Sequence, residues 1–311
     1  MLSVIITSYK EPATIAKAIK CIADSNYSGI PADFELIQVS PDEATLQAGL
    51  EAANSLKLGT KFIQLIDPHQ GKPAALQLAI DQAKGDIILM TDGDVFFEKN
   101  AVAELLKPFK DTTIGGVTGQ PKVLNDRNTL MGFFGHFFVY AADLRRRELF
   151  TEKRENWFTK ANTFFPLSGY IYAIRKPDFK IRTTTSIEDT YISMMTFKRG
   201  LQLAYAPEAI VYTKFATSLK DYLKQRRRTI SGHMELNSYP ELPILPNSRG
   251  IWDELKHFIY PFKFATSLKE FFWAFLLYPL RGLTWLIVFK SKFSKKPVMS
   301  ATGWERIEST K

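Results

Sequence analysis

Two aspartates separated by one glycine follow an apolar run in IILMTDGDVFF, residues 87–97. Such a run, bounded by turn residues, is typical of a buried strand in a parallel sheet, and ligands of open α/β sheets bind beyond the carboxyl ends of these strands. Asp92 and Asp94 are therefore placed where a ligand would bind. Their oxygens can hold a hard cation such as Mg²⁺ or Mn²⁺ that bridges the phosphates of a nucleotide. The alternative is an ordinary Asp-Gly turn between two strands.

Three further groups of polar residues suit the same diphosphate chemistry. Lys72, at a Gly-Lys helix start, supplies a positive charge for a phosphate. Asp189, next to Glu188 in SIEDTYIS, can take the proton from an attacking hydroxyl. Gln225 and Arg228 are three residues apart and share one helical face, from which Arg228 can stabilise a departing diphosphate.

Each group also has a simpler explanation. The segment around Lys72 is no P-loop, because Ile66 stands at the first glycine position and Pro73 follows the lysine. The acidic pair at Glu188 could be a solvated helix start, and the three arginines at 226–228 could be a surface patch. Only the presence of all the groups in one chain favours a diphosphate site.

The elements that would position these residues are short strands alternating with helices. The first half of the chain alternates helical patterns with apolar runs at 2–7, 34–39, 61–66 and 87–90. This alternation indicates an α/β fold with βαβ units and a mainly parallel sheet. Pro12 opens one predicted helix, and Pro73 opens another that ends near Ala83. A long helical pattern at 129–150 and a strand in SGYIYAIRK follow.

The order of these motifs resembles glycosyltransferase family 2, especially its hyaluronan, cellulose and chitin synthase-like branch. The motifs are TSYKEP, GKPAALQLAI, TDGD, IED and QRRRT, and the resemblance runs from Leu2 to about Gly232. It implies a GT-A fold with a mixed, mainly parallel sheet and a nucleotide-diphospho-sugar donor. It also implies a Mg²⁺ or Mn²⁺ cofactor and inversion at the anomeric carbon of the sugar.

The same resemblance gives each motif residue an expected role. The residues expected to bind the nucleotide are Thr7, Tyr9, Glu11, Asp42, Lys72 and Asp92. The expected metal ligand is Asp94, and the expected catalytic residues are Asp189, Glu188, Arg228 and Gln225. Among these, Asp189 matches the general base of the family.

The chain departs from the family pattern in three ways. The second strand ends in SPDEAT, so that Asp42 is the acid expected at the nucleotide base and Ser40 replaces an acidic residue. Thr229 follows the QxxR motif where the synthase branch has tryptophan. The several membrane helices that could form a polymer channel are missing. The last two departures favour transfer of one or a few sugars over secretion of a long polymer.

Composition narrows the class of protein. With 45% hydrophobic residues, the 311-residue chain can bury a substantial core, and its net charge of +9 indicates an anionic partner. Nucleic acid is disfavoured, because the aromatic residues lie in apolar runs and do not alternate with Lys and Arg. Cys21 cannot form an intrachain disulfide and is expected in the core. Met1 leads straight into an apolar strand without a signal peptide, which predicts a catalytic domain facing the cytoplasm.

The segment KFATSLK occurs twice, at 214–220 and 263–269. Each copy contains the spacing of a capping box, with Ser218 before Asp221 and Ser267 before Glu270, so that a helix is expected to start at each. A proline-rich connection lies between the copies. We therefore divide the chain into a GT-A domain at 1–236, a connection at 237–250 and a C-terminal helical region at 251–311.

The C-terminal region has a composition suited to a membrane. An amphipathic pattern begins at 251, and an apolar stretch spans 271–289. Pro279 should kink a helix here and break the stretch at 279–282, and Arg281 would make a straight span costly. This favours an interfacial or re-entrant helix pair, while a single span and a soluble partner-binding face stay open. Lysines at 290, 292, 295 and 296 suit anionic lipid.

The sequence thus predicts a membrane-associated inverting glycosyltransferase that uses a nucleotide-diphosphate donor such as a UDP-sugar. The expected acceptor is a hydroxyl of a lipid-linked or nascent glycan, held by loops such as FFPLSGY. One alternative is transfer to a polyprenyl phosphate, which needs no base. An alternative of another class is a catalytically silent, basic membrane-binding protein of the same fold.

Overall fold

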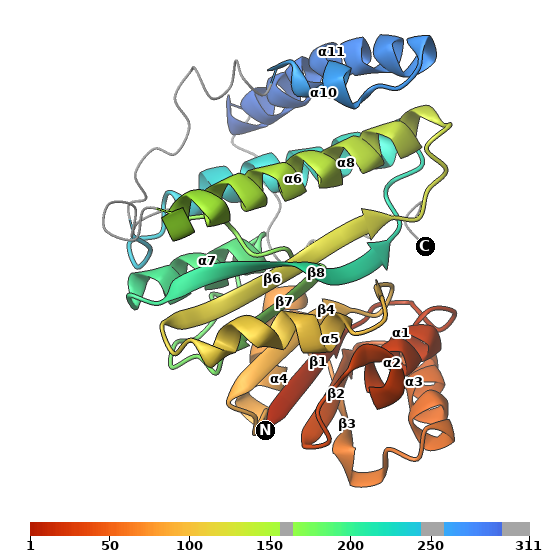
Figure 1. Ribbon diagram of the computed structural model, residues 1–311, viewed down its shortest axis with the longest axis vertical. Coiled ribbons are helices and arrows are strands. Elements are labelled where there is room, and N and C mark those ends of the chain that lie inside the picture. The colour runs from red at the N-terminus through yellow and green to blue at the C-terminus, as the bar shows by residue number, and fades with distance from the viewer. Residues whose placement is uncertain (156–163, 244–257, 294–311) are drawn as a thin grey trace.

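The protein is built on one mixed sheet. In this computed structural model, which describes residues 1–155, 164–243 and 258–293, eight strands are present. Their bounds are β1 Leu2–Thr7, β2 Phe34–Ser40, β3 Phe62–Ile66, β4 Ile87–Asp92, β5 Phe96–Phe97, β6 Ile114–Val123, β7 Ile171–Arg175 and β8 Gln202–Thr213. They lie in the order β3-β2-β1-β4-β7-β6-β8-β5 (Figure 1).

The sheet combines a parallel half with a mixed half. Strands β3, β2, β1 and β4 are parallel, as the βαβ pattern predicted. β7 is antiparallel to both β4 and β6, β6 is parallel to β8, and β5 is antiparallel to β8. The register pairs Thr7 with Asp92, so that β1 and β4 end side by side. The strand order reverses between β1 and β4, and ligands of open sheets bind at such a switch point, beyond the carboxyl ends of the strands.

Helices cover both faces of the sheet. Their bounds are α1 Ile15–Ala23, α2 Ser25–Ser28, α3 Glu43–Ser55, α4 Lys72–Gln82, α5 Ala101–Leu106, α6 Leu130–Glu155, α7 Glu188–Lys198, α8 Leu219–Leu236, α10 Tyr260–Phe264 and α11 Leu268–Phe293. Within β1, Val4 and Ile6 belong to one core with Ile15 of α1, while Ile5 belongs to the other with Leu76 of α4. Burial on both faces explains why the parallel strands are apolar throughout.

Both predicted helix starts at the KFATSLK segments are confirmed. Ser218 caps α8 by accepting a hydrogen bond from the backbone N–H of Asp221 at 3.1 Å. Ser267 does the same for α11 through the N–H of Glu270 at 3.2 Å. The Glu270 carboxylate also receives two hydrogen bonds from Arg127, of 2.8 and 2.9 Å, so the start of α11 is tied to the loop before α6.

An aromatic core joins the C-terminal helices to the rest of the protein. Figure 1 shows α10 and α11 lying outside α6 and α8, on the side away from the sheet. The core between these helices contains Phe133, Phe134 and Tyr222 together with Ala274 and Leu277 of α11. The C-terminal helices therefore pack against α6 and α8 through a shared core.

The predicted helix break at Pro279 is wrong, because α11 continues through this residue as one helix. Proline removes one helical hydrogen bond, but Pro279 lies on the exposed side. Leu277 before it and Leu280 after it pack into the same aromatic core, which stabilises the helix on both sides of the proline.

No helix within the described residues is both long and apolar enough to cross a bilayer. The amphipathic pattern at 251–257 and the lysine cluster at 290–296 lie outside the residues whose side chains the structure describes.

Candidate active site

A cavity of about 360 Å³ opens where β1 and β4 end. It collects residues from segments far apart in the sequence. The lining includes Thr7, Ser8, Tyr9, Glu11, Lys72, Asp92, Asp94, Arg146, the loop 166–170, residues 186–190, Thr213, Lys214, Gln225, Arg226, Arg228, Thr229 and His233. Ten of the eleven residues expected at the site from the sequence therefore line one cavity. The exception is Asp42.

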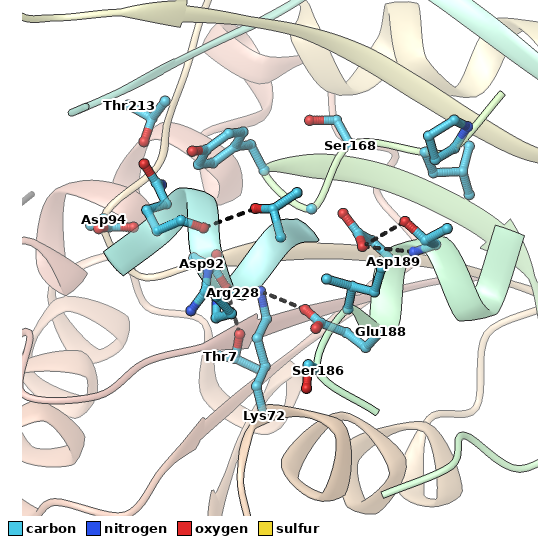
Figure 2. A pocket seen from close by; sticks show the side chains of 18 of the residues that line it. Thr7, Lys72, Asp92, Asp94, Ser168, Ser186, Glu188, Asp189, Thr213 and Arg228 are labelled. Carbon is cyan, nitrogen blue, oxygen red and sulfur yellow. Dashed lines mark hydrogen bonds and ion pairs between the residues drawn. The ribbon is translucent and has the colours of Figure 1, made fainter. Parts of the chain in front are cut away.

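Lys72 forms the centre of a buried charge network (Figure 2). Its Nζ lies 2.7 Å from Oδ1 of Asp92 and 3.1 Å from Oε1 of Glu188, and Thr7 donates a hydrogen bond of 2.7 Å to the same Asp92 oxygen. Burial alone would lower the pKa of Lys72, but the charges of Asp92 and Glu188 raise it well above its ordinary value. Lys72 is thus a fixed cation, and the idea that Glu188 begins a solvated helix is wrong.

Asp189 follows Glu188 in the first turn of α7 but has a different environment. Its Oδ1 accepts hydrogen bonds from the N–H of Thr190 at 2.7 Å and from the Thr190 hydroxyl at 3.3 Å. Burial, and then the charge of Glu188, raise the pKa of Asp189 to about 6. A side chain at Gly169 would place its Cβ 3.0 Å from Oδ2, so glycine leaves room for this carboxylate. Asp189 can therefore accept a proton near neutral pH.

Asp94 lies in the turn between β4 and β5 and lines the cavity on the side opposite Asp189 (Figure 2). No group of three or more acidic, histidine or cysteine side chains able to hold a metal occurs in the part of the chain that is described. The donor set nevertheless fits Mg²⁺ or Mn²⁺, since these cations are commonly bound by one or two carboxylates together with substrate phosphates. Asp94 and the free side of Asp92 would hold such an ion.

Helix α8 contributes Gln225, Arg226, Arg228 and Thr229 to one wall of the cavity. The amide oxygen of Gln225 is buried and has no hydrogen-bond partner among the described residues. The guanidinium of Arg226 lies over the ring of Phe138 at 4.6 Å, and burial lowers its pKa. Arg226 and Arg228 thus face the cavity, and for them the surface-patch interpretation is wrong.

Asp42 holds the loop that carries Tyr9 and Glu11. Its carboxylate caps α3 through the N–H of Thr45 at 3.0 Å and accepts the N–H of Lys10 at 2.7 Å. Burial tends to raise the pKa of Asp42, but these hydrogen bonds lower it below its ordinary value. Its observed contacts are those of a helix cap, and its predicted contact with a nucleotide base stays a prediction.

Several lining residues were not expected from the sequence. They include Ser8, Arg146, Ser186, Lys214 and His233. Tyr170 belongs to FFPLSGY, the loop that was expected to shape the pocket. Arg146 is one of three consecutive arginines in α6, and nothing in the sequence distinguishes it from its neighbours.

The chain is similar to known sugar-transferring proteins. An N-acetylglucosaminyltransferase of Rhizobium meliloti (strain 1021) is 24% identical over 233 residues, which cover 73% of this chain and 54% of that protein. A poly-beta-1,6-N-acetyl-D-glucosamine synthase of Staphylococcus aureus (strain COL) is 24% identical over 238 residues, with coverage of 76% and 55%. The chain thus spans about half the length of these relatives.

A solved structure supports the fold. The mannosyltransferase of Pyrobaculum calidifontis in complex with GDP-Man and Mn²⁺ superimposes with a TM-score of 0.60 at 16% identity, covering 96% of this chain and 81% of that one. At this identity the similarity concerns the fold alone, and it confirms the GT-A prediction. The profile of the glycosyltransferase-like family 2 matches residues 1–232, and the chain therefore belongs to glycosyltransferase family 2.

Proposed function

We propose that this protein is an inverting glycosyltransferase that moves a sugar from a nucleotide-diphosphate donor, specifically a UDP-sugar, to a hydroxyl of a lipid-linked or nascent glycan. The observation that carries this proposal is the convergence of Lys72, Asp94 and Asp189 in one cavity at the sheet edge. A positive charge, a cation-binding carboxylate and a proton acceptor are the three components that such a transfer requires.

The donor diphosphate would lie at the end of the cavity formed by Asp92, Asp94 and Arg228. Thr7 and Lys72 fix the position of Asp92, which leaves Asp94 to bind the cation at the phosphates. A bound Mg²⁺ or Mn²⁺ would neutralise charge on the phosphates. The guanidinium of Arg228 would stabilise the negative charge that develops on the departing diphosphate.

The acceptor would react at the end formed by Asp189. Asp189 takes the proton of the acceptor hydroxyl, the oxygen forms a bond to the anomeric carbon, and the bond from that carbon to the diphosphate oxygen breaks with its electron pair. One displacement inverts the anomeric carbon. A pKa of about 6 leaves Asp189 ionised and still basic enough for this role near neutral pH. It also favours a hydroxyl acceptor over a polyprenyl phosphate, which is already ionised.

The relatives suggest which donor to test first. Both are named for N-acetylglucosamine, so a UDP-linked form of this sugar is the leading candidate. A catalytically silent protein would have no need of a buried carboxylate with a raised pKa beside a fixed lysine.

We further propose that α11 lies on the surface of a membrane. Its outer face carries apolar side chains spaced by three, four or eight residues, and all of them are exposed: Leu268, Phe272, Phe275, Leu283 and Leu286. The opposite face is buried in the aromatic core, so the helix is apolar on both sides. Exposed Lys263 and Lys269 add positive charge that suits anionic lipid.

A donor screen tests the proposed activity. Nucleotide release would be measured for a panel that includes UDP-N-acetylglucosamine and GDP-mannose, with and without Mn²⁺. N-acetylglucosamine oligosaccharides and a polyprenyl phosphate would serve as the two acceptors. We expect cation-dependent release with one donor and the oligosaccharide, and release at least about 100-fold slower from Asp189→Asn. Donor binding without release for every pair would favour the silent protein, and release with polyprenyl phosphate alone would favour that alternative.

A further inference from the structure

Arg146 reaches the active-site cavity from α6, a helix that contributes none of the family motifs. Its side chain is half-buried, and its guanidinium lies over the ring of Tyr205 at 5.9 Å from the centroid. The carboxylates whose charges act on it are Asp189 and Asp143. Arg146 therefore lies at the end of the cavity where the acceptor would react.

Neither of these carboxylates forms an ion pair with Arg146. Asp143 receives two contacts from Nε of Arg147, at 2.8 and 3.0 Å, and also accepts the hydroxyl of Tyr205. Asp189 accepts its hydrogen bonds from Thr190. Within the described ranges, the guanidinium of Arg146 makes no hydrogen bond or ion pair with another side chain.

A partly desolvated guanidinium without a counterion is costly for the protein. Burial lowers the pKa of Arg146, yet arginine does not give up its proton in proteins. Its planar donors match the oxygens of a phosphate or carboxylate in a bidentate geometry. An anion bound here would supply the partner that the protein does not.

The donor diphosphate is not a suitable occupant for this position. The cation-binding Asp94 and the base Asp189 lie on opposite sides of the cavity, with Lys72 between them (Figure 2). Tyr170 interacts electrostatically with Asp94 and Arg228 at the donor end, whereas Arg146 interacts with Asp189. The anion at Arg146 must therefore come from a second substrate.

We propose that Arg146 binds a phosphate or carboxylate group of the acceptor, so that the enzyme prefers an acceptor carrying negative charge near its reacting hydroxyl over a neutral one. This deepens the proposed function and rests on it for the identity of the second substrate. The anion site itself does not depend on turnover. A phosphate would fit a lipid-linked sugar, and a carboxylate would fit an acidic glycan.

The test is binding of small anionic sugars to the full chain, with UDP and Mn²⁺ present in excess to occupy the donor end. Glucose 6-phosphate and methyl glucuronide are the two probes, and glucose is the neutral reference. We expect one of the anionic probes to bind at least about tenfold more tightly than glucose, as a charge-assisted pair predicts. The probe that gains affinity distinguishes a phosphate from a carboxylate.

The matched variants are Arg146→Gln and Arg147→Gln. Arg147 lies next to Arg146 and carries the same charge, but it is exposed and paired with Asp143. We expect Arg146→Gln to weaken binding of the preferred anion by roughly 10- to 100-fold and to leave glucose binding unchanged. Arg147→Gln should alter binding of the preferred anion by less than about twofold. If Arg146→Gln does not fold, Arg146→Lys replaces it. Lysine cannot form the bidentate contact, so this variant should bind the preferred anion roughly three- to tenfold more weakly.

Two outcomes would overturn the proposal. One is that neither anion binds the wild-type chain better than glucose. The other is that the two glutamine variants change anion binding equally, since bulk charge would then explain the effect. If UDP does not bind but binding of the anionic probe still depends on Arg146, the proposed donor is wrong and the anion site stands.

Discussion

Lys72 and Asp92 form an ion pair with an Nζ–Oδ1 distance of 2.7 Å, which joins the start of α4 to the end of β4. Glu188, at the start of α7, is the second acidic partner of the same amine at 3.1 Å. One buried cation thus holds together three elements that surround the cavity. Its removal would leave two carboxylates facing each other.

We expect Lys72→Met to destabilise the protein and to weaken nucleotide binding. A buried group left without its counterion costs about 3 to 5 kcal/mol, and the loss should be near the lower figure because Asp92 is partly exposed. Urea unfolding and titration with UDP would measure the two effects. Lys84→Met, which removes an exposed lysine beyond the end of α4, is the control. Equal stability of both variants would show that the ion pair does not hold the site together.

The raised pKa of Asp189 predicts how activity depends on pH. A general base must be ionised, so kcat/KM should fall as the pH decreases through about 6. Since the charge of Glu188 contributes to the raised pKa, Glu188→Gln should move this decrease in kcat/KM to lower pH. If the decrease stays at the same pH in the variant, another group titrates. The measurement is the pH profile of nucleotide release for both proteins.

Asp189→Asn separates catalysis from stability. Transfer to a hydroxyl should decrease by at least about 100-fold, the usual contribution of a general base, with donor binding retained. The folded state holds a proton on Asp189 more tightly than the unfolded chain does, so ionisation of this carboxyl opposes folding as the pH rises. The variant should therefore be more stable than wild type by roughly 1 to 3 kcal/mol above pH 6, with a smaller difference below it. Loss of donor binding would assign Asp189 to the nucleotide.

Asp94→Ala should remove cation-dependent turnover while the fold survives. Asp94 lies in a turn at the cavity, and it is part of neither hydrophobic core that packs on the sheet. We expect EDTA to abolish nucleotide release by wild type and to have no further effect on the variant. Asp126→Ala, in an exposed loop, is the control for a lost negative charge. Full activity of Asp94→Ala would contradict the assignment of the metal ligand.

The sequence was most informative where the signal is local. An apolar run followed by Asp-Gly-Asp predicted a strand end with two carboxylates, because strand and turn preferences depend on near neighbours. Asp42 carried a local signal as well: an aspartate three residues before Thr45, whose N–H it accepts, is a helix cap. The contact of Asp42 with a nucleotide base is implied only by the resemblance and stays a prediction.

Contacts between distant segments could not be derived in the same way. The pairing of Lys72 with Glu188 depends on how α7 is placed against α4, which no local pattern encodes. Arg146 and Arg147 are chemically alike, and only the rotation of α6 in its packing decides which one reaches the cavity. Pro279 failed to end its helix because tertiary packing outweighed local propensity.

The contact between Arg127 and Glu270 predicts a pH dependence of stability. Hydrogen bonds from Arg127 lower the pKa of Glu270 to about 2. A depressed carboxyl pKa stabilises the fold above the pKa of the unfolded chain, and this contribution is lost as the pH decreases toward 2. Glu270→Gln should lower the free energy of unfolding by about 1 to 3 kcal/mol at neutral pH, with a difference that shrinks in acid. Urea unfolding of both proteins at several pH values measures this difference in free energy. A difference that does not change with pH would argue against the ion pair.

The outer face of α11 gives the sharpest test of membrane association, because its side chains are largely exposed. Phe272 and Phe275 are 64% and 61% exposed, so replacing both with serine removes mainly exposed apolar surface, together with one ring contact between Phe275 and Phe262. Each phenylalanine buried at a bilayer surface contributes about 1.5 to 3 kcal/mol, and the double variant should bind phosphatidylglycerol vesicles at least about tenfold more weakly. The control is Ile66→Ser, which removes a side chain that is 75% exposed at the end of β3, far from α11. Vesicle sedimentation at low and high salt would separate the apolar contribution from that of the lysines, since only the latter is screened. If the double variant and the control bind alike, the apolar face of α11 must contact another protein surface.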